Sequence, residues 1–193
     1  ASEEPDTVPG RKLRRMIIED VASDVATFVR GDTSLDELLG GRGTAAPGLL
    51  QRRGIALLGS HPTRTSPTKR GRWVASQLLC LEPKPPPPGS DAFKSTAEPV
   101  DVRKALEEHA SRKSCASCHA LIDPIGLSLE GFDQEGRRRS RYGDGTPVST
   151  DTTLPDGTKL GGVEDLVSWL RAQPGLDACL SRSTAALALG RPL

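Results

Sequence analysis

Five consecutive residues constrain this chain more than any other feature: Cys115-Ala116-Ser117-Cys118-His119, called the CxxCH motif below. On a helical turn, residues three and four positions apart share a face, so both sulfur atoms and the imidazole can approach one object. Two thioether bonds to the vinyl groups of a haem, with histidine as the proximal iron ligand, match this arrangement. The motif therefore predicts one covalently attached haem c per chain, held by Cys115, Cys118 and His119.

Two other kinds of site also use a Cys-x-x-Cys pair. A zinc site would need further ligands from Cys80, Cys179 or a histidine, and the sequence has no second Cys-x-x-Cys pair and no His-x-His hairpin. A thioredoxin-like redox pair belongs to a βαβ pattern, which does not surround this motif. Haem attachment is the main interpretation, and zinc and redox chemistry are the alternatives.

The composition fits a fold built around a cofactor. Hydrophobic residues without glycine make up 35% of the 193 residues and aromatic residues only 3%; counted with the 20 glycines, the apolar content is at the lower end of the roughly 45–50% of an average chain. A haem supplies a large apolar disc around which such a chain can build an interior, although partial disorder is an equal interpretation for the two ends. The net charge of +1 gives no reason to expect a nucleic-acid partner. No stretch approaches the roughly 18 apolar residues of a membrane span, so we expect none.

The spacing of apolar residues predicts a mostly α-helical fold with long irregular loops. Helices are expected at about residues 11–30, 33–39, 70–81, from 101 into the CxxCH motif, 163–172 and 175–189, with mostly loop from 43 to 69 and strand-like pieces at best in 124–162. Residues 1–50 are interpreted as an N-terminal helical arm. Residues 51–193 are interpreted as a cytochrome-c-like haem domain, which includes a proline-rich linker at 82–100.

The second ring nitrogen of a metal-bound histidine is normally oriented by a backbone carbonyl or a carboxylate. The segment Asp123-Pro124-Ile125-Gly126 follows His119 at a suitable distance for a carbonyl group to do this. We also interpret it as a proline turn that closes the motif helix. Pro124 is therefore grouped with the predicted cofactor-binding residues.

The distal side of the haem has no obvious ligand after the motif. The only methionine is Met16, and the other histidines, His61 and His109, also precede the motif. His109 lies on the helix entering the motif and is expected to pack in the core. His61, in a Gly/Pro-rich loop, is the first distal candidate, Met16 the second and an open site the third; an exposed imidazole is the alternative role for His61.

Two cysteines remain once the haem has taken its pair. Cys80 and Cys179 are expected to form a disulfide, because an exported protein tends to oxidise such a pair; two buried thiols are the alternative. A basic cluster after the motif could steer an acidic redox partner or contact the haem propionates, or it could be a solvated loop. The cluster consists of Arg137, Arg138, Arg139 and Arg141.

Residues outside the motif carry a family resemblance. They are Arg64–Val74, Leu78–Cys80, Ile122–Asp133, Asp156-Gly157 and Leu187–Leu193. On these residues the chain resembles the secreted cytochrome-c-like proteins of planctomycetes and myxobacteria, in which the domains of unknown function 1588 and 1585 are adjacent. Residues 11–40 resemble the tail of domain of unknown function 1592, which normally precedes them. The resemblance covers about residues 54–193 and implies haem binding and export.

The sequence thus predicts an exported c-type cytochrome, periplasmic or extracellular, that transfers electrons to or from a redox partner protein. Two observations support the location: covalent haem attachment takes place outside the bacterial cytoplasm, and the predicted disulfide suits an oxidising compartment. The alternative is a haem enzyme or sensor with an open distal site, such as a peroxidase-like module. We interpret the chain as an electron carrier rather than a catalyst.

Overall fold

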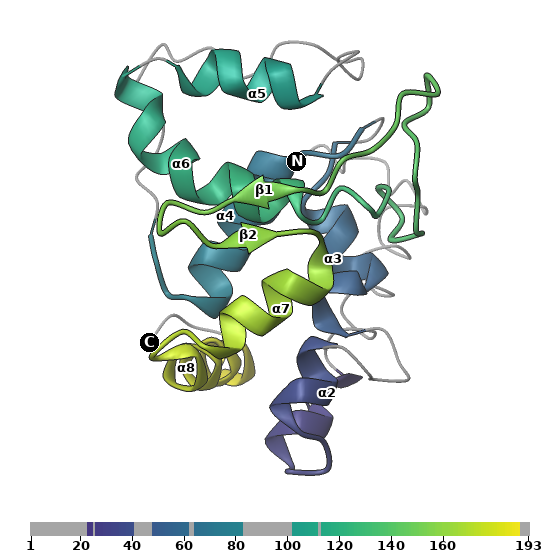
Figure 1. Ribbon diagram of the computed structural model, residues 1–193. Helices are drawn as coiled ribbons and strands as arrows, with labels where there is room; N and C mark the ends of the chain where they lie inside the picture. The colour runs from purple at the N-terminus through teal and green to yellow at the C-terminus, as the bar shows by residue number, and fades with distance from the viewer. Residues whose placement is uncertain are drawn as a thin grey trace, which may run out of the picture.

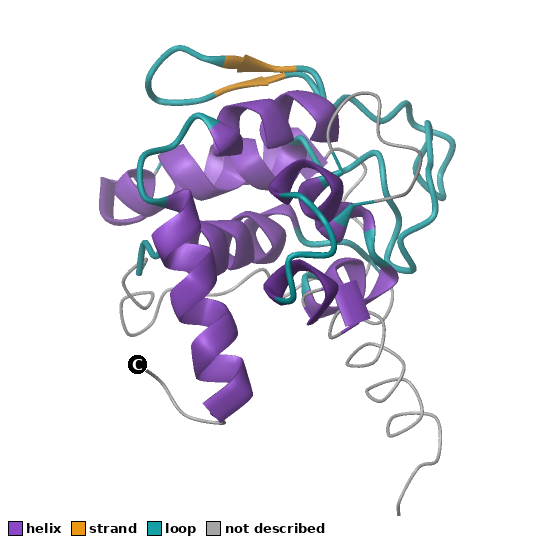
Figure 2. Cartoon of the chain, turned by 90° about the horizontal axis from the view of Figure 1, so that it is seen from below, coloured by secondary structure: helices purple, strands orange, loops and turns teal. Residues whose placement is uncertain are grey.

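The computed structural model describes residues 23–24, 26–40, 48–61, 64–82, 102–111 and 113–189. Within these ranges the chain is mostly helical, as predicted, and the strands form one short hairpin (Figure 1 and Figure 2). The elements are α2 (Leu35–Leu39), η1 (Leu49–Gln51), α3 (Arg53–Leu58), α4 (Pro67–Leu78), α5 (Val102–Ala110), α6 (Lys113–Leu127), β1 (Thr152–Thr153), β2 (Lys159–Leu160), α7 (Val163–Arg171) and α8 (Leu176–Leu189).

The short helix predicted at residues 33–39 is confirmed as α2. The Ser34 hydroxyl accepts a hydrogen bond from the Glu37 backbone N–H, and the Glu37 carboxylate accepts one from the Ser34 backbone N–H. This reciprocal capping box satisfies two N–H groups that would otherwise lack partners. Gly40 ends the helix with φ 76°, a left-handed conformation that suits glycine. Leu38 and Leu39 are buried in the main core, so α2 packs on the body of the protein.

Some predicted segments lie outside the described residues. They are Met16, most of the helix predicted at 11–30, and residues 83–100 of the predicted linker. Residues 26–29, near the end of the predicted first helix, are helical. The boundary between an arm and a haem domain at residue 50 stays a prediction.

The loop predicted from 43 to 69 is wrong in part, because this stretch contains η1, α3 and the first turn of α4. The helix predicted at 70–81 is present as α4, but it begins earlier, at Pro67, and ends at Leu78. Ser66 caps it by accepting a hydrogen bond from the Lys69 N–H at 3.4 Å. Proline is favoured at the first helical position, where no N–H is needed. Pro67 therefore starts a helix here instead of breaking one.

The expected proline turn after the motif is also wrong, because α6 continues through Pro124 to Leu127. Pro124 cannot donate the usual backbone hydrogen bond, and a proline ring crowds the preceding turn. The ribbon of α6 changes direction partway along its length, as expected for a helix with an internal proline (Figure 1).

The helices α4 and α6 cross with their backbones in contact. A Cβ atom added to Gly71 of α4 would collide with the carbonyl oxygen of Ile122, and one added to Gly126 of α6 would collide with that of Pro67. Glycine is required at both positions because no larger residue leaves room for this approach. The core beside the crossing is aliphatic and fully buried, and includes Val74, Leu78, Ile125, Leu166, Val167 and Leu170.

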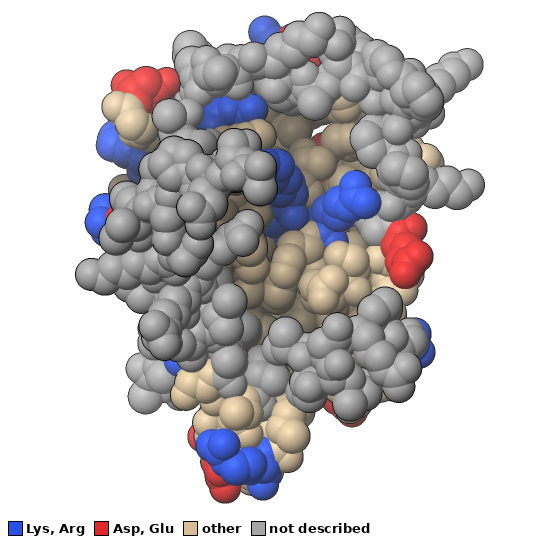
Figure 3. Space-filling view, turned by 180° about the vertical axis from the view of Figure 1, so that it is seen from behind, with Lys and Arg blue, Asp and Glu red and all other residues tan. Residues whose placement is uncertain are grey.

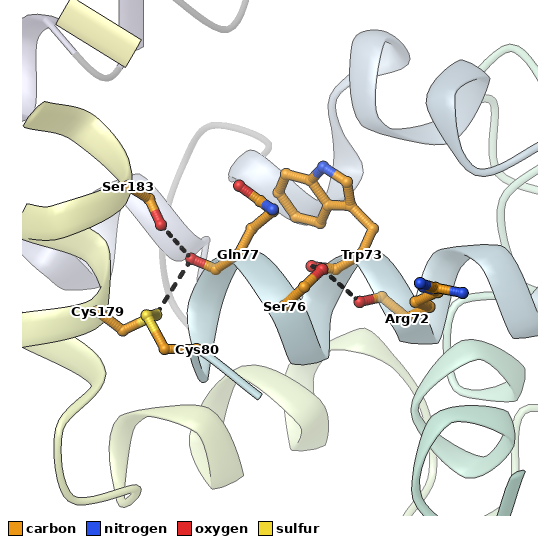
Figure 4. The surroundings of a disulfide bond; sticks show 7 residues. All are labelled: Arg72, Trp73, Ser76, Gln77, Cys80, Cys179 and Ser183. Carbon is orange, nitrogen blue, oxygen red and sulfur yellow. Dashed lines mark hydrogen bonds between the residues drawn. A yellow bond between two sulfur atoms is a disulfide. The ribbon is translucent and has the colours of Figure 1, made fainter. Parts of the chain in front are cut away.

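The C-terminal part of the chain follows the prediction closely. The antiparallel hairpin β1–β2 pairs Thr152 with Leu160, and α7 and α8 match the helices expected at 163–172 and 175–189. A disulfide between Cys80 and Cys179 joins the end of α4 to α8 (Figure 4), which confirms the predicted pairing. None of the described helices is both long enough and apolar enough to cross a membrane.

The surroundings of the disulfide add a second link between α4 and α8. The Ser183 hydroxyl donates a hydrogen bond to the Gln77 carbonyl oxygen at 3.0 Å (Figure 4). The Cys179 sulfur lies 3.5 Å from the same oxygen, but a disulfide sulfur carries no proton and this is a contact only. The end of α4 is thus fixed to α8 by one covalent bond and one hydrogen bond.

Candidate functional site

The CxxCH motif lies in the first half of α6. Cys115 is buried and Cys118 is half-buried, and neither belongs to a disulfide. Cys115 and His119 are four residues apart and therefore share a face of the helix. The expected helical placement of the motif is confirmed.

The ring of His119 is held by a carboxylate. Its Nδ1 lies 2.8 Å from Oδ2 of Asp123, one turn further along α6. The other carboxylate oxygen, Oδ1, accepts a hydrogen bond from the Thr68 hydroxyl of α4 at 2.8 Å. The sequence analysis expected a backbone carbonyl in this role, and the structure provides the Asp123 side chain instead. The signal was the four-residue spacing between a histidine and an aspartate, which places both on one helical face.

A cavity of about 810 Å³ lies beside His119, bounded by α5, α6 and the β1–β2 hairpin. This volume falls in the range of about 300–1,000 Å³ typical of small-molecule and cofactor sites. Its walls include the apolar side chains of Leu106, Leu127 and Leu160. Pro124, one of the predicted cofactor-binding residues, also lines it.

Two basic residues stand at the side of the cavity opposite α6. Arg103 of α5 donates hydrogen bonds to the backbone oxygens of Asp151 at 2.7 Å and Ser149 at 3.4 Å. Lys159 of β2 is exposed and also lines the cavity. Arg103 therefore ties α5 to the segment before the hairpin. The two cations share the cavity lining with four carboxylates, those of Glu107, Asp123, Asp151 and Asp165.

His109 lies on α5, close to the motif histidine. The centroids of the His109 and His119 rings are 4.7 Å apart, with an interplanar angle of 60°. His109 is half-buried and is not among the residues of the main core. The helix predicted from residue 101 into the motif is present in part: α5 ends at Ala110, and the separate helix α6 carries the motif.

The first distal candidate, His61, lies elsewhere. Its Nδ1 is 3.5 Å from Lys69 Nζ, and its backbone N–H donates to the Arg64 carbonyl oxygen at 2.8 Å. Burial, together with the charges of Lys69 and Arg64, lowers the pKa of His61. Among the described residues that line the cavity beside His119, His61 is not found. Cys115 and Cys118 lie on the same helix as His119, but, like His61, they are not among the described residues that line this cavity.

The zinc alternative loses two of its possible ligands. Cys80 and Cys179 are consumed by their disulfide, so they cannot complete a site with Cys115 and Cys118. In the part of the chain that the structure describes, no group of three or more His, Cys, Asp or Glu side chains could hold a metal ion. Closed zinc sites usually need four such ligands.

A buried ionic network ties the segment after α6 to α4, and of its members only Arg139 had a role predicted from the sequence, in the basic cluster. The Glu130 side chain is fully buried and accepts hydrogen bonds from Arg139 at 2.7 Å and Thr65 at 2.8 Å. Arg70 of α4 lies 3.6 Å from its other oxygen, and also donates to the Phe132 carbonyl at 2.7 Å. Burial raises the pKa of Glu130, and the two guanidinium charges oppose that rise. No periodicity marks such a network, because its members are far apart in the chain.

The basic cluster after the motif is tied into the fold. Arg138 pairs with Glu164 at 3.2 Å and lies over the Phe132 ring, while Arg139 pairs with the buried Glu130. Arg137 pairs with Glu135, and Arg141 donates to the Gly145 carbonyl oxygen. In the view from behind, basic and acidic side chains are interspersed on the described surface (Figure 3). A role of this cluster toward a redox partner stays a prediction.

Comparison with known proteins gives one match. The model of the family PSCyt3, described as a protein of unknown function (DUF1588), matches residues 46–142, which is half of the chain. The matched range contains α4, the CxxCH motif, Asp123 and Glu130. Neither the curated proteins nor the solved structures contain a match.

Proposed function

Since this chain belongs to the PSCyt3 family, we propose that it is an exported c-type cytochrome that binds one haem c and transfers electrons. Cys115 and Cys118 would form the thioether bonds, and His119 would be the proximal iron ligand. The single observation that carries the proposal is the cavity beside His119 on the motif helix.

The residues around this cavity fit a haem on three counts. First, the volume of about 810 Å³ accommodates a group of that size. Second, leucine side chains from α5, α6 and β2 offer an apolar wall to a flat apolar ring. Third, Arg103 and Lys159 offer positive charge for two propionate groups. A haem would supply a one-electron ferric/ferrous couple.

His119 has the right form to bind a metal through Nε2. Because Asp123 accepts at Nδ1, that nitrogen carries the proton and Nε2 keeps its lone pair. α6 also contributes Leu127 to the lining of the same cavity as His119.

The distal ligand decides between electron transfer and the alternative, a peroxidase-like enzyme or sensor with an open site. His61 and Met16 remain the candidates from the sequence, and Met16 lies outside the described residues. His109 is a further candidate to be tested, because its ring lies 4.7 Å from that of His119. Two histidine ligands would give a lower reduction potential than histidine with methionine.

A location outside the cytoplasm follows from the same proposal. The disulfide between Cys80 and Cys179 supports it, because such bonds persist in oxidising compartments. A redox partner protein is part of the proposal, since an electron carrier needs a donor and an acceptor.

The proposal is tested by producing the protein in a bacterial periplasm together with the c-type haem maturation proteins. The wild type is expected to keep haem on a denaturing gel, whereas Cys115→Ala/Cys118→Ala is expected to lose it completely. The matched control is Cys80→Ser/Cys179→Ser, which removes the other two thiols and should keep the haem stain. A wild type without stain, beside a stained reference cytochrome, contradicts haem c binding.

The ferric absorption spectrum then separates the two functions. A low-spin spectrum that changes little with imidazole or cyanide supports electron transfer. A high-spin spectrum that changes readily supports the open-site alternative. The variants His61→Ala, His109→Ala and Met16→Ala identify the distal ligand, because only the loss of the true ligand converts a low-spin spectrum to a high-spin one.

A further inference from the structure

Both oxygens of the Asp123 carboxylate have a defined partner. Oδ2 lies 2.8 Å from Nδ1 of His119, and Oδ1 accepts the Thr68 hydroxyl at 2.8 Å. Asp123 is 6% exposed, so water competes little for these bonds. Hydrogen bonds to an ionised acceptor are stronger than bonds between neutral groups. The chain Thr68–Asp123–His119 is therefore a short, shielded series of hydrogen bonds that ends at the proposed iron ligand.

The direction of each bond follows from the groups involved. A hydroxyl that donates to a carboxylate stabilises the ionised acid, and an ionised carboxylate can only accept. His119 is thus the donor at Nδ1. A carboxylate in this position draws the proton of Nδ1 toward itself and makes Nε2 a stronger electron donor toward a bound metal. The Thr68 hydroxyl acts against this, because it takes part of the negative charge of Asp123.

The crossing of α4 and α6 holds the hydrogen-bonded residues Thr68, Asp123 and His119 in place. Thr68 precedes Gly71 by three residues, and Asp123 precedes Gly126 by the same number. The backbones touch at these glycines, so the turns carrying Thr68 and Asp123 cannot slide past each other without a clash. The hydrogen bonds are therefore maintained by the packing of two helices and not by a flexible loop.

We propose that Asp123 is a positioning residue that lowers the reduction potential of the haem bound by His119, and that Thr68 limits this effect. The inference rests on the proposed function above. A stronger nitrogen donor stabilises ferric iron over ferrous iron, so one-electron reduction by the partner becomes less favourable. With the same iron ligands, the protein would therefore have a lower reduction potential with Asp123 than without it.

Two substitutions are expected to shift the potential in opposite directions. Asp123→Asn keeps the shape of the side chain but removes its charge, so the potential should rise. Thr68→Val removes the hydroxyl from the carboxylate, so the potential should fall. For Asp123→Asn we expect at least a tenfold change in the ferric/ferrous equilibrium, which is about 59 mV for one electron. Potentials are measured by spectroscopic titration of the haem-loaded protein with dithionite and ferricyanide.

The matched control is Asp151→Asn. Asp151 also lines the cavity, and its substitution removes the same charge without touching His119. Thr68→Ser keeps a hydroxyl at this position and should have the wild-type reduction potential. Equal shifts in Asp123→Asn and Asp151→Asn would show a response to net charge alone and overturn the inference. Shifts of the same sign in Asp123→Asn and Thr68→Val would overturn it too, because loosened packing would act in one direction.

The failure of the inference and the failure of the proposed function give different results. A wild type without haem stain overturns the proposed function before any potential is measured. A haem-loaded wild type whose potential is unchanged by Asp123→Asn overturns only the inference. If Asp123→Asn does not fold, Thr68→Val decides alone: a lower potential supports the inference, and an unchanged or higher one contradicts it.

Discussion

The two sides of the cavity differ in how they are held. The side that carries His119 is α6, which lies against the backbone of α4 at Gly71 and Gly126. The opposite side is α5 with the β1–β2 hairpin. α5 contributes Val102 and Leu106 to a small apolar cluster with Leu127 that is separate from the main core, whereas Leu160 of β2 belongs to the main core.

The difference shows which atoms of this site have to be placed accurately. On the α6 side, the orientation of one imidazole depends on hydrogen bonds of 2.8 Å, so a shift of a fraction of an ångström would break them. On the α5 side, Arg103 donates hydrogen bonds to backbone oxygens near the surface. We expect α5 to move there with little loss of buried apolar area. Regions with few buried contacts open at lower free energy than core regions.

The largest expected effect comes from releasing α4, the helix behind the α6 side. Cys80→Ser/Cys179→Ser should lower the free energy of unfolding by about 4 kcal/mol, because the disulfide closes a loop with a sequence separation of 99. Urea unfolding followed by circular dichroism measures the change. An unchanged midpoint would mean that the glycine crossing alone fixes α4.

The next effect tests the crossing itself. Gly71→Ala forces a methyl group against the Ile122 carbonyl and should cost about 3 kcal/mol, the upper end of what overpacking usually costs. Gly143→Ala is the control, because nothing lies within 4 Å of the added atom, and it should change stability by less than about 0.5 kcal/mol. Equal effects in the same urea assay would show that the two helices tolerate separation.

The smallest effect is expected on the α5 side. Arg103→Ala removes hydrogen bonds to Asp151 and Ser149 and should change global stability by no more than about 0.5 kcal/mol. Its consequence should be local: faster amide hydrogen exchange in α5 and the hairpin, with α4 and α6 unchanged. A large loss of global stability, or faster exchange throughout, would contradict the division into two sides.

Much of the fold could be predicted from the sequence because it depends on local patterns of residues. The apolar spacing of α5, α7 and α8 repeats every three to four residues, which is sufficient to place a helix. The Cys80–Cys179 pairing followed from the four cysteines once the motif had claimed two. The prolines were harder, since Pro67 begins a helix and Pro124 lies inside one, and the identity of the residue does not distinguish these cases.

Only part of the candidate site could be predicted from the sequence. The CxxCH motif is contiguous, so its residues and their role as a unit could be predicted. The partner of His119 was expected four to seven residues later, but a carbonyl was favoured over the Asp123 carboxylate because the helix was predicted to end there. Thr68 could not be found, because it is 55 residues from Asp123 and meets it only through the packing of α4 on α6. The same limit applies to Glu130 and Arg70.

The position of the disulfide has a consequence for the biogenesis of this protein. Cys115 lies 35 residues after Cys80, whereas the native partner Cys179 is at a separation of 99. Because the probability of closing a flexible loop falls as the 3/2 power of its length, an unfolded chain would bring Cys80 to Cys115 about five times more often than to Cys179. Haem attachment that precedes oxidation would remove both competing thiols and leave one possible pair. The order of the two covalent modifications would then determine the yield of correctly cross-linked protein.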